Sequence, residues 1–146
     1  MKAVFFAAGI PKGQPRPRAF SRGGHARVFD PGTAEGWKSC VAVAAQPFRG
    51  RYTSGCPLYV SIHFLFPRPK AHIRKGTEIK LGAPVFHSSK PDIDNAAKAV
   101  LDALTQIGVW ADDCQVVNLF LSKRYADDGR PGAQVTIDTI TIGGGE

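Results

Sequence analysis

Four segments of the chain are either continuously apolar or alternate between apolar and polar residues, and these patterns predict four β-strands. The segments are residues 3–8, 57–66, 115–123 and 134–142. Apolar residues that recur three or four positions apart predict two helices, over residues 33–46 and 94–106. The second helix is rich in Ala and Leu and has no internal Gly or Pro, which favours helix formation. In the third strand, Val117, Leu119 and Leu121 are expected to share one face.

The predicted elements follow one another in the order β–α–β–α–β–β. This order is typical of an α/β domain of the α+β type, in which the helices pack on one small mixed β-sheet to form two layers. A chain of 146 residues is long enough for one such domain, and its 43% of hydrophobic residues can form a core. We therefore expect one domain over residues 1–146.

Two stretches between these elements are rich in basic side chains. The first covers residues 9–32, and its many Gly and Pro residues predict a loop or an extended ribbon. It holds four arginines: Arg16, Arg18, Arg22 and Arg27. Their guanidinium groups suit phosphate contacts, and Phe20 offers a ring on which a base can stack. The second stretch covers residues 67–90 and ends at Lys90. The residues alone leave open that both stretches are solvated loops without a partner.

The net charge is unevenly distributed along the chain. In total, 19 Lys and Arg residues stand against 12 Asp and Glu residues, for a net charge of +7. Residues 1–91 contain 15 basic and 3 acidic side chains, whereas residues 92–146 contain 4 basic and 9 acidic ones. This division excludes a uniformly basic protein. It indicates a polyanionic partner together with an acid-rich site in the same chain.

The candidate chemistry lies in the acidic segment of residues 90–115. Asp92 and Asp94 lie where the chain enters the second predicted helix, and Asp112 and Asp113 follow the turn after it. Carboxylate oxygens of this kind are ligands for Mg²⁺, with Mn²⁺ as an alternative. The helix between the two pairs is roughly 15–20 Å long. Bringing Asp113 to Asp92 and Asp94 therefore requires help from the fold or from a second subunit.

The same acids also have an ordinary structural explanation. Asp94, Lys98 and Asp102 are spaced four residues apart, so they could form a salt-bridge ladder on one helix face, worth a few tenths of a kcal/mol per pair, on the order of 0.3. Asp92 could be a turn residue after Pro91. The spacing of the acids does not by itself decide between this explanation and a metal site.

Two stretches of this segment resemble a known family. Residues 90–104, KPDIDNAAKAVLDAL, and residues 110–117, WADDCQVV, are similar to the RusA family of Holliday junction resolvases. Its pattern is KPDxDNxxKxxxDAL, a short spacer, and then DD-x-QV. The PRPR of residues 15–18 also resembles the basic N-terminal loop of that family. The resemblance implies a RusA-like fold. It also implies a homodimeric, Mg²⁺-dependent endonuclease that nicks paired strands of four-way (Holliday) junctions in DNA recombination and repair.

The resemblance also implies roles for individual residues. Asp92, Asp94 and Asp113 would be the catalytic acids that bind the metal, and Lys98 the catalytic basic residue. Lys98 would stabilise negative charge on the phosphate or orient Asp94. Asp102 would be the partner of Lys98 on the helix face. The residues expected to support the site are Asn95, Asp102 and Asp112, and those expected to bind DNA are Arg16, Arg18, Arg22, Arg27 and Lys90.

Two other functions account for parts of the sequence. A non-catalytic DNA-binding or architectural protein would keep the arginine-rich loops around a degenerate metal site. The presence of Asp92, Asp94, Lys98 and Asp113 argues against it. A Mg²⁺ enzyme acting on nucleotides would need a glycine-rich loop that cradles phosphate, and the sequence has neither a P-loop nor a GxGxxG motif.

Cysteine content and hydropathy indicate the compartment. The three cysteines, Cys40, Cys56 and Cys114, have no metal-ligand spacing, and an odd number of thiols is typical of a reducing cytoplasm. No apolar run approaches the roughly 20 residues that span a bilayer. We expect a cytoplasmic protein without membrane contact, and the resemblance implies a bacterial, phage or prophage origin.

Overall fold

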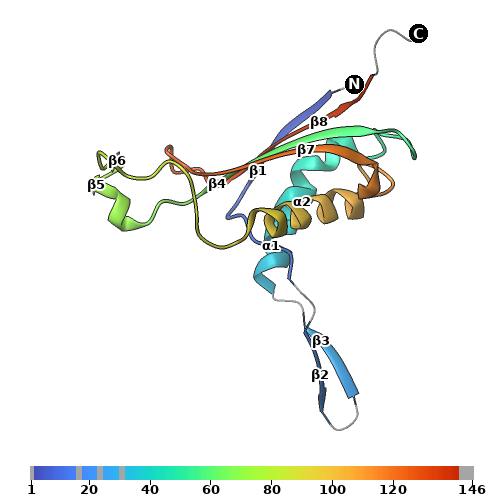
Figure 1. Cartoon of the computed structure of the whole chain (residues 1–146), viewed down its shortest axis with the longest axis horizontal. Coiled ribbons are helices and arrows are strands. Elements are labelled where there is room, and N and C mark those ends of the chain that lie inside the picture. The colour runs from blue at the N-terminus through green and yellow to red at the C-terminus, as the bar shows by residue number, and fades with distance from the viewer. Residues whose placement is uncertain (1, 16–17, 23–24, 30–31, 142–146) are drawn as a thin grey trace.

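Two helices lie against one face of a four-stranded sheet in the computed structural model (Figure 1). The structure describes residues 2–15, 18–22, 25–29 and 32–141, and for residues 18–22, 25–29, 32 and 33 it describes the backbone. Across the sheet the strands are β1 (Lys2–Ala8), β8 (Gly132–Thr139), β4 (Leu58–Phe66) and β7 (Val116–Tyr125). This arrangement confirms the predicted two-layer α+β fold.

The sheet is mixed, as predicted, because β8 runs antiparallel to both β1 and β4, whereas β4 and β7 are parallel. The parallel pair is joined through helix α2 (Ile93–Ile107), since parallel neighbours need a crossover connection. The register of β4 and β7 shifts near Leu58, where Val117 of β7 is an extra residue. Val117 is therefore 58% exposed, and the predicted common face of Val117, Leu119 and Leu121 is wrong at Val117.

The hydrophobic core lies between the sheet and the two helices. Alternate residues of β4, including Val60, Ile62 and Phe64, are fully buried. Helix α1 (Gly32–Ala45) contributes Trp37 and Val41 from the opposite layer. The described part of the chain contains no helix that is long and apolar enough to cross a membrane.

Helix α2 ends where the sequence permits a left-handed backbone. Gly108 has φ +84°, a conformation that favours glycine, and its N–H donates to the carbonyls of Leu104 and Thr105. These bonds close the helix, and the next residues, Val109 and Trp110, are buried in the core. The closure turns the chain back toward the start of β7.

Two small hairpins and three short 3₁₀ helices complete the fold. Strands β2 (Arg18–Arg22) and β3 (His25–Phe29) form a hairpin that projects away from the body of the molecule (Figure 1). Strands β5 (Ile73–Lys75) and β6 (Glu78–Ile79) pair within the second basic loop. The 3₁₀ helices are η1 (Gln46–Phe48), η2 (Lys70–His72) and η3 (Asp113–Gln115). In the first basic stretch, residues 18–22 and 25–29 thus form an extended ribbon, one of the two forms that its composition predicted.

Candidate functional site

The head of α2 presents two carboxylates to solvent. Asp92 is the N-cap residue, but its side chain makes no capping bond and instead accepts a hydrogen bond of 3.0 Å from Nζ of Lys90. Asp94 lies in the first helical turn and accepts from the N–H of Asn95 at 2.9 Å. Negative charge is favourable at a helix N-terminus because the helix dipole is positive there. Both charges are therefore tolerated at this position. Asp94 forms no ion pair within 4 Å with another described residue.

Residues 13 and 14 of the N-terminal segment pack directly on the N-terminus of α2. The N–H of Gln14 donates to the carbonyl oxygen of Asn95 at 3.1 Å. Gly13 allows the close approach, because a Cβ at this position would lie 2.4 Å from Nδ2 of Asn95 and 3.2 Å from Cβ of Pro91. Asn95, predicted to support the site, is the residue that this segment contacts, and its support of the site stays a prediction. The chain that leads toward the arginine-rich hairpin consequently passes beside the N-terminus of α2, where the two acids lie.

The hairpin register segregates its residues between two faces. Arg18 pairs with Phe29, Phe20 with Arg27 and Arg22 with His25, and the intervening pairs contain only Ala, Ser and Val. Residues opposite one another in an antiparallel ladder belong to the same face, and faces alternate along a strand. One face therefore holds the register positions of Arg18, Phe20, Arg22, His25, Arg27 and Phe29. The predicted DNA-binding residue Arg16 lies outside the described residues, as do the side chains of Arg18, Arg22 and Arg27.

Asp112 and Asp113 are held at the turn between α2 and β7. Asp112 caps η3 by accepting from the N–H of Cys114 at 3.2 Å. Oε1 of Gln115 accepts from the N–H groups of Ala111 and Asp112, and its Nε2 donates to the carbonyls of Thr53 and Cys56. The Gln115 amide is 6% exposed, so its four hydrogen bonds fix the turn to the segment before β4. Sequence reasoning missed this role, although a Gln between the acids and an apolar strand was a visible signal.

Burial, the neighbouring Asp112 and two charged residues of α2 determine the electrostatic environment of Asp113. Burial and the adjacent Asp112 carboxylate raise the pKa of Asp113 above its usual value, and the Lys98 ammonium lowers it in part. The Asp102 carboxylate acts on Asp113 as well and raises its pKa. The hydrogen bond from the N–H of Cys114 lowers the pKa of Asp112. Asp113 therefore lies within electrostatic reach of Lys98 and keeps its proton to higher pH than Asp112.

The predicted pairing of Asp102 with Lys98 is wrong. Asp102 accepts a hydrogen bond of 2.5 Å from Nζ of Lys38 on α1, and a second one of 3.2 Å from Gln106. Lys38 is 5% exposed, so this ion pair joins the two helices at their interface. Lys98 is exposed and forms no ion pair within 4 Å in the described part of the chain. Its ammonium is consequently open to a phosphate.

The donor set has the chemistry for Mg²⁺ but is not gathered in one place in the described part of the chain. Carboxylate oxygens are the ligands that Mg²⁺ prefers. Among the described residues, however, no three His, Cys, Asp or Glu side chains come together in a group that could hold a metal ion. Asp113 is thus not gathered with Asp92 and Asp94 within one chain. The metal assignment of these three acids stays a prediction.

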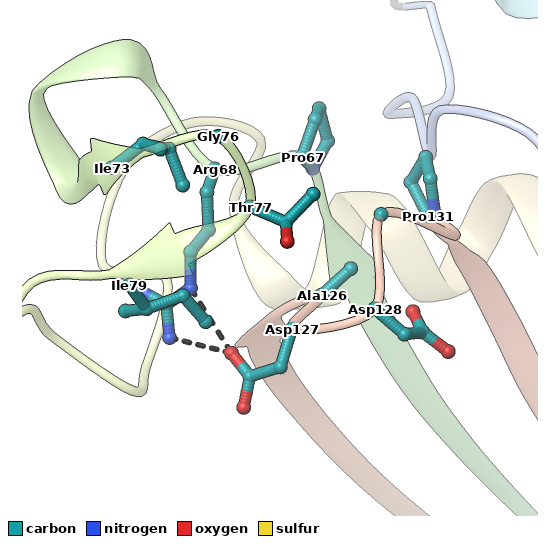
Figure 2. A pocket seen from close by; sticks show the side chains of 11 residues that line it. Pro67, Arg68, Ile73, Gly76, Thr77, Ile79, Ala126, Asp127, Asp128 and Pro131 are labelled. Atoms are coloured by element: carbon teal, nitrogen blue, oxygen red, sulfur yellow. Dashed lines mark hydrogen bonds and ion pairs between the residues drawn. The ribbon is translucent and has the colours of Figure 1, made fainter.

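A separate pocket of about 390 Å³ lies between the second basic loop and the turn of residues 126–131 (Figure 2). Arg68 closes one side of it, donating from Nε and Nη2 to Oδ1 of Asp127 at 3.0 and 2.8 Å, and from Nη1 to the carbonyl of Pro84 at 2.7 Å. The Arg68 side chain is only 6% exposed. It fastens the second basic loop to the sheet, and no predicted site residue lines this pocket.

The comparison with protein families decides what kind of protein this is. Residues 8–138 match the family model described as Endodeoxyribonuclease RusA. The chain belongs to the RusA family. A relative from Bacillus subtilis (strain 168), the uncharacterized protein YqaN, is 33% identical over 128 residues, which are 86% of this chain and 89% of that protein. RusA membership confirms the resemblance carried by the KPDIDN and DDCQV segments and makes the chain a member of an endodeoxyribonuclease family.

Proposed function

We propose that this RusA-family protein is a Mg²⁺-dependent endonuclease that resolves four-way DNA junctions by paired nicking, in recombination and repair. The observation that carries the proposal is the Gln14–Asn95 contact, which sets the chain leading toward the arginine-rich hairpin beside the helix turn that holds Asp92 and Asp94. Carboxylates repel a phosphodiester, so acids at a DNA-binding surface call for a cation between the two. Mn²⁺ is the alternative cation.

The residues of the site then have separate roles. Asp92, Asp94 and Asp113 would hold the metal, which when bound activates water and offsets charge on the attacking and leaving oxygens. Lys98 would stabilise the negative charge that develops on the phosphate, because its ammonium is exposed near Asp113. The side chain of Lys90 is 86% exposed and would contact a neighbouring phosphate.

We propose a homodimer as the active form, because paired nicks need two sites and one protomer gathers an incomplete set of acids. The edge strand β7 supports this assembly. Residues 85–87 cover its outer edge only near Lys123 and Tyr125, through two backbone hydrogen bonds. Farther back on the strand, the exposed side chains are those of Val117, Leu119 and Phe120, at 58%, 42% and 56%. Leu119 and Phe120 lie on opposite faces of the sheet, so these apolar side chains border an uncovered strand edge, which is a template for pairing with another chain.

The charges at the two ends of β7 also fit self-association. The strand begins just after Asp113 and ends beside Arg124. When two copies meet antiparallel about a two-fold axis, the acidic end of each faces the basic end of the other, which is electrostatically favourable. The second protomer would thereby bring its Asp113 toward the head of the first protomer's α2.

The second candidate function is a non-catalytic DNA-binding protein with a degenerate metal site. The incomplete ligand set of the protomer is the observation in its favour. A cleavage assay on a synthetic four-way junction with Mg²⁺ separates the two functions, because the second one allows binding but no cutting. Such binding would also be non-specific and steeply dependent on salt.

A further inference from the structure

Lys123 carries a positive charge on the side of the sheet that faces the helices. It is in register with Phe64 of β4, whose side chain is fully buried, and it follows Leu119 and Leu121 on the same face of β7. Its Nζ atom lies 5.8 Å from the ring centroid of Phe66. Burial lowers the pKa of the Lys123 ammonium, and the Asp92 carboxylate raises it in part. A partly buried charge of this kind is costly unless hydrogen bonds compensate it.

Two carbonyl groups supply that compensation. Nζ of Lys123 donates to the carbonyl oxygens of Ser89 and Pro91, each at 2.6 Å. The backbone of Lys123 holds the same segment at a third point, because its carbonyl accepts from the N–H of His87 at 3.1 Å. One residue of the sheet therefore fixes three alternate positions of the chain that leads into α2.

The last of these positions determines the orientation of Asp92. The Pro91 carbonyl and the N–H of Asp92 belong to the same planar peptide unit. Fixing the Pro91 oxygen therefore fixes the orientation of the peptide plane that leads into Asp92. The Asp92 side chain itself is 55% exposed, and it accepts a hydrogen bond from Lys90, whose side chain is 86% exposed. Half-exposed contacts of this kind orient a carboxylate weakly. The backbone that Lys123 holds constrains Asp92 in addition, through the Pro91 carbonyl.

We propose that Lys123 is a positioning residue of the site, which clamps residues 87–91 so that the Asp92 carboxylate stands at the head of α2. The proposal rests on the proposed nuclease function for the meaning of that placement. It assigns Lys123 no contact with DNA and no direct part in the reaction.

The test compares Lys123→Met, Lys123→Gln and Lys123→Arg in the full-length protein, with Lys2→Met in β1 as a matched lysine on another strand. Hydrogen–deuterium exchange reports the order of residues 88–94 and of the rest of α2. The junction Kd and the single-turnover cleavage rate are measured separately with Mg²⁺. The Gln variant can still donate to one carbonyl, and it carries the test if the Met variant does not fold.

In Lys123→Met we expect exchange to accelerate at residues 88–94 and to stay unchanged at residues 100–107. The cleavage rate should fall about 100-fold while the junction Kd changes less than about threefold, since a small misplacement of a reacting group acts on the rate. Lys123→Arg should restore part of the rate, because a guanidinium can donate to both carbonyls. Lys2→Met should behave as the wild-type protein.

Full cleavage by Lys123→Met, or acceleration of exchange throughout the protein, would overturn the positioning role. If the wild-type protein itself does not cut, the nuclease function fails instead. The exchange measurement then still decides whether Lys123 holds residues 88–94, so the two failures are distinguishable.

Discussion

The N–H of Gln14 donates a hydrogen bond of 3.1 Å to the carbonyl oxygen of Asn95, and this bond joins the basic and the acidic parts of the protein. Gln14 precedes β2, the first strand of the arginine-rich hairpin, by four positions, whereas Asn95 follows Asp94 in the first turn of α2. Under the proposed function, DNA bound at the hairpin would thereby lie close to the carboxylates. The contact explains how opposite charges in distant parts of the sequence can serve one reaction.

Gly13→Val tests the contact between the N-terminal segment and helix α2. A valine Cβ would lie 2.4 Å from Nδ2 of Asn95, so either Asn95 or the N-terminal segment must move. We expect junction cleavage to fall about 10–100-fold and the free energy of unfolding to fall by about 1–2 kcal/mol. Single-turnover kinetics and urea unfolding measure the two effects.

Gly36→Ala is the matched control, because a Cβ at Gly36 in α1 meets no atom within 4 Å. It should raise the free energy of unfolding by about 0.5–1 kcal/mol, since Ala is the better helix former. Cleavage should stay at the wild-type rate. Wild-type cleavage by Gly13→Val would contradict the importance of the contact.

Gln115→Ala should destabilise the turn that carries Asp113. The substitution leaves partly buried backbone groups of residues 53, 56, 111 and 112 without their side-chain partner. Leaving such groups unsatisfied costs about 2–3 kcal/mol. The control is Gln106→Ala, which removes a single hydrogen bond to Asp102 at an exposed position. Equal unfolding free energies for the two variants in urea would show that Gln115 does not anchor the turn.

Much of this fold could be predicted from the sequence because hydrophobic periodicity reports local geometry. The alternation in β4 and the helical repeat in α2 each reflect a face that is buried, and both elements were predicted within one residue of their observed bounds. Strand β8, in contrast, ends at Thr139 rather than at residue 142. The acids Asp92, Asp94 and Asp113 were identified by their motif rather than by periodicity.

The interactions that the sequence did not predict are all non-local. Lys38 meets Asp102 across 64 positions of the chain, so the i, i+4 spacing to Lys98 was misleading. The common face of the arginines and phenylalanines in the hairpin depends on how β2 and β3 pair, which the composition does not define. The lysine clamp at residue 123 depends on the packing of residues 85–91 against β7. Such contacts follow from tertiary structure alone.

Phe120→Asp tests the proposed homodimer. Phe120 is 56% exposed on the edge strand β7, and a carboxylate there would be desolvated in a dimer interface. We expect a dimer for the wild-type protein in sedimentation velocity and a monomer for the variant. The control is Val43→Asp, at an apolar residue of α1 that is 71% exposed, which should remain dimeric. A monomeric wild-type protein at micromolar concentration would contradict the homodimer, and a dimeric Phe120→Asp would remove β7 from its interface.

The most direct test of the central claim is cleavage of a synthetic four-way junction beside the matching linear duplex, with Mg²⁺ and with EDTA. We expect paired nicks in the junction, little cutting of the duplex and no cutting in EDTA. Asp94→Asn should lower the rate at least about 10²–10³-fold while junction binding persists or tightens, because a repulsive charge has gone. Asp128→Asn, in the turn before β8, should cut normally. Equal cutting of junction and duplex, or full activity of Asp94→Asn, would contradict the account.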